Sequence, residues 1–219
     1  MKIPKFKNQK LLEQAFIHRS YLNETKKKLE SNERLEFLGD SILSSVVSEF
    51  LYQEYPNFNE GILTNIRSLL VNTKSLAQVS LELNFGSLLK LSKGEEESKG
   101  RQNKSLLADS FEAFVGALFI DQGIDSVKDF LKEVLLFKAE KIVEQKAFKD
   151  PKSLLQEKIQ AQKQDSPSYR VISEEGPAHA KLFTVGVFVG NMKLGQGEGK
   201  SKQEAEEMAA KEALEGNAE

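Results

Sequence analysis

The chain has 219 residues, of which 39% are apolar and 29% are charged, and its formal net charge is −2. These values are ordinary for a globular protein and leave room for one medium domain and one small domain. Cysteine is absent and histidine occurs only twice, which excludes a zinc site built from thiolates and imidazoles. A bound metal would therefore need oxygen ligands, which favours Mg²⁺, Mn²⁺ or Ca²⁺.

Nothing in the sequence indicates a membrane protein or an exported protein. The basic start MKIPKFKNQK lacks the apolar run of a signal peptide, and the longest apolar stretch, residues 114–120, is too short to span a bilayer. We therefore expect a cytoplasmic location and no membrane partner. Basic and acidic residues are nearly balanced in both parts of the chain, so charge alone does not point to nucleic acid.

The first part of the chain predicts an all-α domain. A short amphipathic helix ends near His18, which we interpret as a helix-end residue bonded to backbone. The next helix ends before Pro56, because the residue that precedes a proline disfavours helical geometry. A polar segment, residues 92–104, predicts a surface loop. The expected helices cover residues 9–17, 32–52, a stretch that begins at Glu60, 106–121 and 124–144.

Three acids follow one face of the second helix. In the segment NERLEFLGDS, Glu33, Glu36 and Asp40 stand at i, i+3 and i+7, which places them within about 60° of one another on a helix. Like charges this close repel one another. Such a row of acids is stable when it faces water. It can become a functional site when a metal ion or another charged group binds to the acids.

A second acid pair follows in ADSFEAFVGALFID. Asp109 and Glu112 stand at i and i+3, and the small residue Gly116 shares their face. Small residues allow another helix to approach closely. A crossing there would bring this pair opposite Glu36 and Asp40, with four carboxylates around one point. The alternative is a pair of solvated acidic faces.

The second part of the chain predicts a small α+β domain. Residues 145–151 lack periodicity and end in a proline, so we expect a domain at 1–147, a short linker at 148–151 and a second domain at 152–219. The predicted order αβββα consists of a helix at 153–161, strands near 169–172, 183–189 and 192–194, and a helix that begins at Ser201 with a Ser-x-x-Glu capping box.

The start of the last helix carries a candidate phosphate site. Gly195, Gly197 and Gly199 lead into Lys200 and Lys202. Free backbone N–H groups and the helix dipole favour an anion at such a position. Lysines there otherwise oppose the dipole, so their placement favours a bound phosphate.

Both halves together resemble one family. The segments NERLEFLGDS and ADSFEAFVGALFID resemble the two signature segments of bacterial ribonuclease III, the endonuclease that cleaves double-stranded RNA. The segments LLQEKIQ, PSYRVISEEGPAH and GQGEGKSKQEAEEMAA resemble a double-stranded-RNA-binding domain in the same order and spacing. The resemblance covers essentially the whole chain.

The resemblance implies roles for residues of the first domain. The expected metal ligands are Glu36, Asp40, Asp109 and Glu112, and the expected catalytic acids are Asp40, Glu112, Glu33 and Glu60. Glu60 also has a simpler interpretation, because an acid in a first helical turn complements the dipole. The family works as a homodimer, and Phe37 matches an aromatic residue that inserts into a cavity of the partner subunit.

The resemblance also implies how RNA is read. The expected contacts with the minor groove come from Gln156, Gln160, Pro177 and His179, and the expected phosphate contacts come from Lys200 and Lys202. For His179 a loop-packing role is the alternative. Gln203 departs from the family pattern, which usually has a second basic residue at this position.

The implied activity is cleavage by water with Mg²⁺ as cofactor, for which Mn²⁺ can substitute. Neither signature contains a histidine, a cysteine or an activated serine, so a covalent nucleophile is not expected. The implied products carry 5′-phosphate and 3′-hydroxyl ends with short 3′ overhangs, and the implied substrates are precursors of ribosomal RNA and other structured transcripts. Two alternatives are a non-catalytic RNA-binding protein and a structural helical dimer. Mg²⁺-dependent cleavage of a duplex separates all three.

Overall fold

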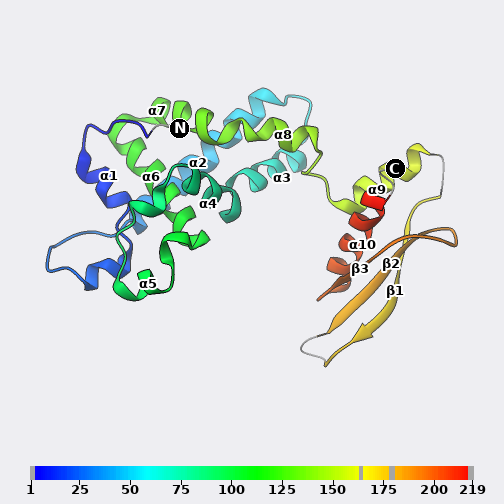
Figure 1. The fold of residues 1–219 in the computed structure, drawn as a ribbon. Helices are drawn as coiled ribbons and strands as arrows, with labels where there is room; N and C mark the ends of the chain where they lie inside the picture. The colour runs from blue at the N-terminus through cyan, green and yellow to red at the C-terminus, as the bar shows by residue number, and fades with distance from the viewer. Residues whose placement is uncertain (1–2, 163–164, 178–180, 217–219) are drawn as a thin grey trace. The chain divides into compact units, whose positions relative to one another are not determined.

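The computed structural model describes residues 3–162, 165–177 and 181–216. The chain divides into two compact units, Met1–Phe148 and Lys149–Glu219, each with its own core. The first unit is built from helices, and the second combines two helices with a three-stranded sheet (Figure 1). The expected fold class is therefore confirmed. The exact linker, residues 148–151, stays a prediction: Phe148 lies in the first core, and Asp150 already caps the next helix.

The helices of the first unit follow the predicted order with three differences. The stretch predicted as one helix at 124–144 is interrupted by a π-helical turn at Lys132–Leu136. The helix that begins at Glu60 ends at Val71, and the side chain of Asn72, the next residue, caps a further helix. The third difference is the polar segment 92–104, which contains a short helix. The helices are α1 (Gln9–Ala15), α2 (Glu33–Glu54), α3 (Glu60–Val71), α4 (Thr73–Glu82), α5 (Lys93–Glu97), α6 (Lys104–Gln122), α7 (Ile124–Leu131) and α8 (Lys138–Glu144).

Helix α6 is the centre of the first unit. It packs against α1, α2, α4 and α7, and most of its side chains between 107 and 118 are buried. The ring of Phe114 lies 5.0 Å from that of Phe130 and 5.1 Å from that of Phe85, measured between centroids. Each buried phenylalanine contributes about 1.5–3 kcal/mol of transfer free energy. The acids on α6 are therefore carried by a helix that is held from several sides.

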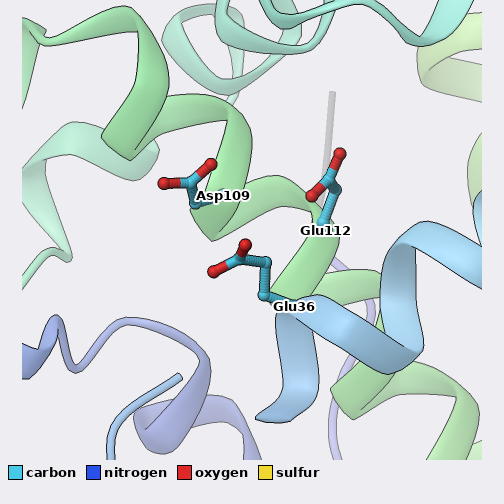
Figure 2. A group of neighbouring side chains, drawn as sticks. All are labelled: Glu36, Asp109 and Glu112. Atoms are coloured by element: carbon cyan, nitrogen blue, oxygen red, sulfur yellow. The ribbon is translucent and has the colours of Figure 1, made fainter. Parts of the chain in front are cut away.

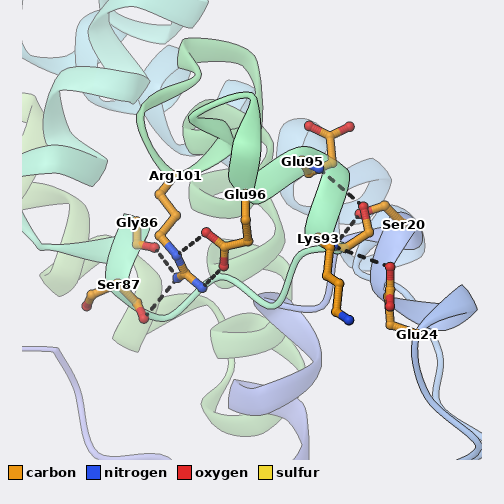
Figure 3. A network of polar contacts seen from close by, with 9 residues as sticks. Ser20, Glu24, Gly86, Ser87, Lys93, Glu95, Glu96 and Arg101 are labelled. Carbon is orange, nitrogen blue, oxygen red and sulfur yellow. Dashed lines mark hydrogen bonds and ion pairs between the residues drawn. The ribbon is translucent and has the colours of Figure 1, made fainter.

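The polar segment between α4 and α6 is tied to the rest of the unit (Figure 3). Arg101 pairs with Glu96 and donates a hydrogen bond to the carbonyl oxygen of Gly86 at 2.8 Å. At the other end, the backbone N–H of Ser92 donates to the hydroxyl of Ser20 at 3.0 Å. The segment thus links the turn after α1, at Ser20, with the turn after α4, at Gly86.

The second unit has the predicted order αβββα. Its elements are α9 (Pro151–Ala161), β1 (Ser168–Glu175), β2 (Leu182–Val189), β3 (Met192–Gly199) and α10 (Lys202–Gly216). The strands are antiparallel in the order β1-β2-β3, and α10 packs against β3, β2 and α9.

The glycines before α10 have a packing role. Gly195, Gly197 and Gly199 lie within β3 and are buried. A Cβ atom at Gly197 would lie 2.3 Å from the backbone nitrogen of Ala209 on α10. The absence of side chains on this face of β3 therefore lets α10 pack directly against the strand.

Within the described residues, no helix is long and apolar enough to cross a bilayer.

Candidate active site

The candidate site lies where α2 crosses α6. Gly39 on α2 and Gly116 on α6 are both buried at this crossing. A Cβ atom at Gly39 would lie 1.7 Å from the carbonyl oxygen of Glu112, and one at Gly116 would lie 2.2 Å from that of Leu35. The two backbones are therefore in direct contact, which a side chain at either position would prevent. Since Glu36 is about one turn from Gly39, the crossing brings it close to Glu112.

Three carboxylates converge at this crossing (Figure 2). One carboxylate oxygen from each of Glu36, Asp109 and Glu112 lies within 4.8 Å of those of the other two. All three side chains are half-buried. The expected contact between the two acid pairs is thus present for three of the four residues. Asp40, the fourth, is exposed on α2 and does not belong to this group within the described part of the chain.

The environment of the three carboxylates disfavours their ionised form. Burial, followed by the charges of Asp40, Asp109 and Glu36, raises the pKa of Glu112 to about 8. Burial is also the largest cause that raises the pKa of Glu36 and that of Asp109. A cation bound among these oxygens would remove the repulsion and favour the ionised form of each acid.

The donor set fits a hard divalent cation. All three groups offer carboxylate oxygens, which Mg²⁺, Mn²⁺ and Ca²⁺ prefer. Three acids also leave coordination positions for water and for substrate oxygens, as a catalytic rather than a closed structural site requires.

A small cavity of about 290 Å³ adjoins the cluster. Its lining comprises His18, Arg19, Asn32, Glu33, Glu36, Leu89, Leu106 and Asp109. His18 caps the turn after α1, as expected: its Nδ1 lies 2.8 Å from the hydroxyl of Ser20 and accepts from the N–H of that residue at 3.3 Å. The charge of His18 also lowers the pKa of Asp109, although burial outweighs this effect. The proximity of His18 to Asp109 had no signal in the sequence, because the two residues lie far apart along the chain.

The two outer acids lie in different surroundings. Glu33 accepts a hydrogen bond from the hydroxyl of Ser31 at 2.8 Å and lies 3.6 Å from Arg19 in an exposed ion pair. Glu60 is exposed on α3 and accepts from the hydroxyl of Thr64 at 3.2 Å. The groove that Glu60 lines is formed by α3 and the second half of α2, and none of the three clustered carboxylates lines it. Within one chain, Glu60 is therefore separate from the cluster.

Phe37 is the most exposed large apolar side chain among the described residues, with 79% of its surface accessible. It stands next to Glu36 on the first turns of α2. While this ring is exposed to water, it does not gain the favourable free energy of apolar burial. Burial against a partner surface would recover that free energy.

The expected RNA-reading residues of the second unit are on its surface. Gln156 and Gln160 are exposed on α9, and Pro177, Lys200 and Lys202 are exposed as well. His179 lies outside the described residues. Gln203 donates a hydrogen bond to Glu207, one turn further along α10.

The start of α10 confirms half of the expected capping box. The N–H of Glu204 donates to the hydroxyl of Ser201 at 3.1 Å. The carboxylate of Glu204 accepts instead from the N–H of Lys200, at 2.7 Å. An internal carboxylate therefore already binds one backbone donor at this helix start.

Comparison with known proteins gives a consistent assignment for both units. Residues 8–139 match the family described as Ribonuclease-III-like, and residues 151–216 match the double-stranded RNA binding motif. Proteins named Ribonuclease 3 from Bacillus cytotoxicus and Bacillus cereus are 50% identical to this chain over 213 residues, which cover 95% of this chain and 85% of theirs.

Solved structures extend this similarity to the fold. A nuclease domain of ribonuclease III from Campylobacter jejuni is 37% identical with a TM-score of 0.57, and the match covers 62% of this chain and 90% of that one. A Dicer from Pichia stipitis is 32% identical with a TM-score of 0.50, covering 98% of this chain and 97% of that one. Taken with the acidic cluster and the αβββα unit, these matches show that the chain belongs to the ribonuclease III family, as a bacterial endoribonuclease with a double-stranded-RNA-binding domain.

Proposed function

We propose that this chain cleaves double-stranded RNA in a Mg²⁺-dependent reaction, by attack of water on a backbone phosphate. The observation that carries this proposal is the convergence of Glu36, Asp109 and Glu112 at a glycine-lined helix crossing. Repulsion from neighbouring carboxylates, which adds to burial in raising the pKa of Glu36 and that of Glu112, supports it, because a bound cation would relieve this repulsion.

The proposed metal ligands are the three clustered acids together with Asp40. A bound Mg²⁺ would polarise the phosphate, lower the pKa of a water molecule and shield the departing oxygen, and Mn²⁺ could substitute. Asp40 lies within electrostatic reach of the cluster, since its charge raises the pKa of both Glu36 and Glu112.

The bond changes follow from attack by water. The water oxygen bonds to phosphorus, the bond from phosphorus to the 3′ oxygen breaks, and a proton passes to that oxygen. The products then carry 5′-phosphate and 3′-hydroxyl ends. Two such cuts at staggered positions on opposite strands would leave the short 3′ overhangs.

We propose that two copies of the chain form the active enzyme. The exposed ring of Phe37 beside the acidic cluster supports a symmetric interface at this end of α2. One Campylobacter structure concerns a region involved in dimer formation of the nuclease domain. In such a dimer, Glu33 and Glu60 would line the path of the RNA outside the metal ligands.

We propose that the second unit recognises the duplex by shape. Gln156, Gln160, Pro177 and His179 would contact the minor groove, where 2′-hydroxyl groups distinguish RNA from DNA. Lys200 and Lys202 would contact phosphates. Precursors of ribosomal RNA and other structured transcripts are the proposed substrates, and the cytoplasm remains the predicted location.

The test is cleavage of a labelled RNA duplex by the wild-type chain and by Glu112→Gln, with and without Mg²⁺. We expect Glu112→Gln to bind the duplex nearly as well as the wild type and to lose cleavage in Mg²⁺, because it removes one charged ligand. Glu133→Gln is the matched control: Glu133 is exposed and has no ion pair within the described part of the chain. Wild-type cleavage by Glu112→Gln would refute the metal assignment, and no cleavage by the wild type would favour an RNA-binding role without catalysis.

A further inference from the structure

One carboxylate bridges two lysines at the start of α10. The Nζ atom of Lys202 lies 3.0 Å from one carboxylate oxygen of Glu174, and the Nζ atom of Lys181 lies 3.0 Å from the other. Glu174 is near the end of β1, Lys181 directly precedes β2, and Lys202 is the first residue of α10. Three separate segments of the unit thus meet in this trio.

An aromatic ring completes the arrangement. Glu174 and Phe183 are paired residues in the register of β1 and β2. The Nζ atoms of Lys202 and Lys181 lie 5.5 Å and 5.9 Å from the centroid of the Phe183 ring. The ring attracts each ammonium group, so both lysines are held at the position of the carboxylate.

The same end of the helix carries the proposed phosphate contacts. Lys202 is one of the two lysines assigned to phosphates, and the backbone N–H of the other, Lys200, is already bound to the carboxylate of Glu204. Hydrogen bonds from Lys202 and then from Lys181 lower the pKa of Glu174, so this carboxylate is ionised at neutral pH. In the free protein, internal carboxylates therefore occupy donors that a phosphate would need.

We propose that Glu174 is an internal competitor of the RNA phosphate for Lys181 and Lys202, and that it limits how tightly the unit holds a duplex. This inference rests on the proposed phosphate contact of Lys202. With Glu174 ionised, the three side chains together carry a net charge of +1, whereas the two lysines alone would carry +2. A phosphate that approaches must therefore displace the carboxylate or share the lysines with it. Removal of the carboxylate charge should leave both lysines free for phosphate and should increase the number of counterions that binding releases.

The experiment measures binding of the full chain to a short RNA duplex across a salt series, with a chelator present so that no cleavage occurs. We expect Glu174→Gln to bind about two- to fivefold more tightly than the wild type at low salt, the scale of one or two exposed ion pairs. Its salt dependence should be steeper by up to about 0.9 in the slope of log K against log salt, which corresponds to one further phosphate contact.

Glu175→Gln provides the matched control. Glu175 is the next residue of β1, is exposed, and has no ion pair within the described residues, so this variant makes the same change in charge without touching the trio. Its gain in affinity should be clearly smaller. Thermal unfolding of both variants checks that the fold is retained.

Two outcomes would overturn the inference: weaker binding by Glu174→Gln, which would mean that the carboxylate positions Lys202 for RNA, or equal gains for the two glutamate variants.

The Lys202→Gln variant distinguishes a failure of the competition inference from a failure of the proposed phosphate contact. If Lys202→Gln binds the duplex like the wild type, the phosphate contact itself is wrong. If it weakens binding while the glutamate variants behave alike, only the competition is wrong. When Glu174→Gln is combined with Lys202→Gln, it should increase the affinity for the duplex less than it does in the wild type.

Discussion

Gly39 and Gly116 face each other at the crossing of α2 and α6, and each lies against the other helix's backbone. The contact leaves no room for a methyl group, since a Cβ atom at Gly39 would lie 1.7 Å from the carbonyl oxygen of Glu112. The position of the three clustered carboxylates depends on this approach, because Glu36 and Glu112 are each about one turn from a glycine of the crossing.

Gly39→Ala should therefore damage both stability and activity. The clash is between backbone atoms and cannot be relieved by a side-chain rotation, so we expect a loss of about 3 kcal/mol or failure to fold. Gly61→Ala on α3 is the control, because its Cβ atom would meet its nearest neighbour at 3.6 Å. Alanine there should be neutral or slightly stabilising. Chemical denaturation of both variants measures the difference, and a Gly39→Ala protein as stable as Gly61→Ala would contradict the close approach of the two helices.

The raised pKa of Glu112 predicts a dependence of stability on pH in the absence of metal. The pKa rises from 4.5 in an unperturbed glutamate to about 8 in the fold. Between these values the folded state binds more protons than the unfolded state, so the stability that this group contributes is complete below the lower value and is lost as the pH rises through the upper one.

Glu112→Gln removes this titration. With a chelator present, its melting temperature should exceed that of the wild type increasingly from about pH 5 to about pH 8.5, by roughly 2–4 °C for each kcal/mol recovered. Saturating Mg²⁺ should stabilise the wild type more than the variant, because the ion binds the ionised acid. Glu133→Gln should follow the wild type throughout. A difference between Glu112→Gln and the wild type that does not change with pH would contradict the raised pKa.

Phe37→Ala should weaken the proposed dimer. The ring is 79% exposed in the single chain, so its loss costs the monomer little, whereas a partner pocket would lose a large apolar contact. Analytical ultracentrifugation over a dilution series should show dissociation at higher protein concentration than for the wild type. Phe137→Ala, at another exposed phenylalanine of the same unit, should leave the dimer unchanged. Identical sedimentation of Phe37→Ala and the wild type down to low concentration would rule out this role.

A fragment that ends at Lys149 should retain cleavage but bind RNA weakly. All four proposed metal ligands lie in the first compact unit, whereas the proposed RNA-reading glutamines and lysines lie in the second. Fewer lysines on the phosphates release fewer counterions, so the salt dependence of binding should become shallower. Low salt or Mn²⁺ should partly restore cleavage by the fragment, but no salt concentration should restore Glu112→Gln in Mg²⁺.

The comparison for this prediction is cleavage of one duplex by the full chain and by the fragment across a salt series. A fragment that is folded and dimeric but inactive at every salt concentration would show that the second unit contributes directly to the catalytic site.

The sequence by itself determined the fold class and which acids share a helix face. Helical spacing placed Glu33, Glu36 and Asp40 on one face and Asp109 with Glu112 on another, because the period of a helix is fixed by its backbone. Alternating residues and turn signals likewise predicted the αβββα order, and the absence of cysteine left oxygen as the donor for a metal.

The tertiary structure alone decided which of these groups meet. Spacing gives the face of a helix but neither the partner helix nor the point of crossing, and these depend on backbone contact at Gly39 and Gly116. Glu60, which the family resemblance placed with the catalytic acids, lies along a separate groove of the single chain. The bridge from Glu174 to Lys202 joins a strand end to a helix start, and no local pattern encodes it, because its members meet only when the sheet and α10 pack together.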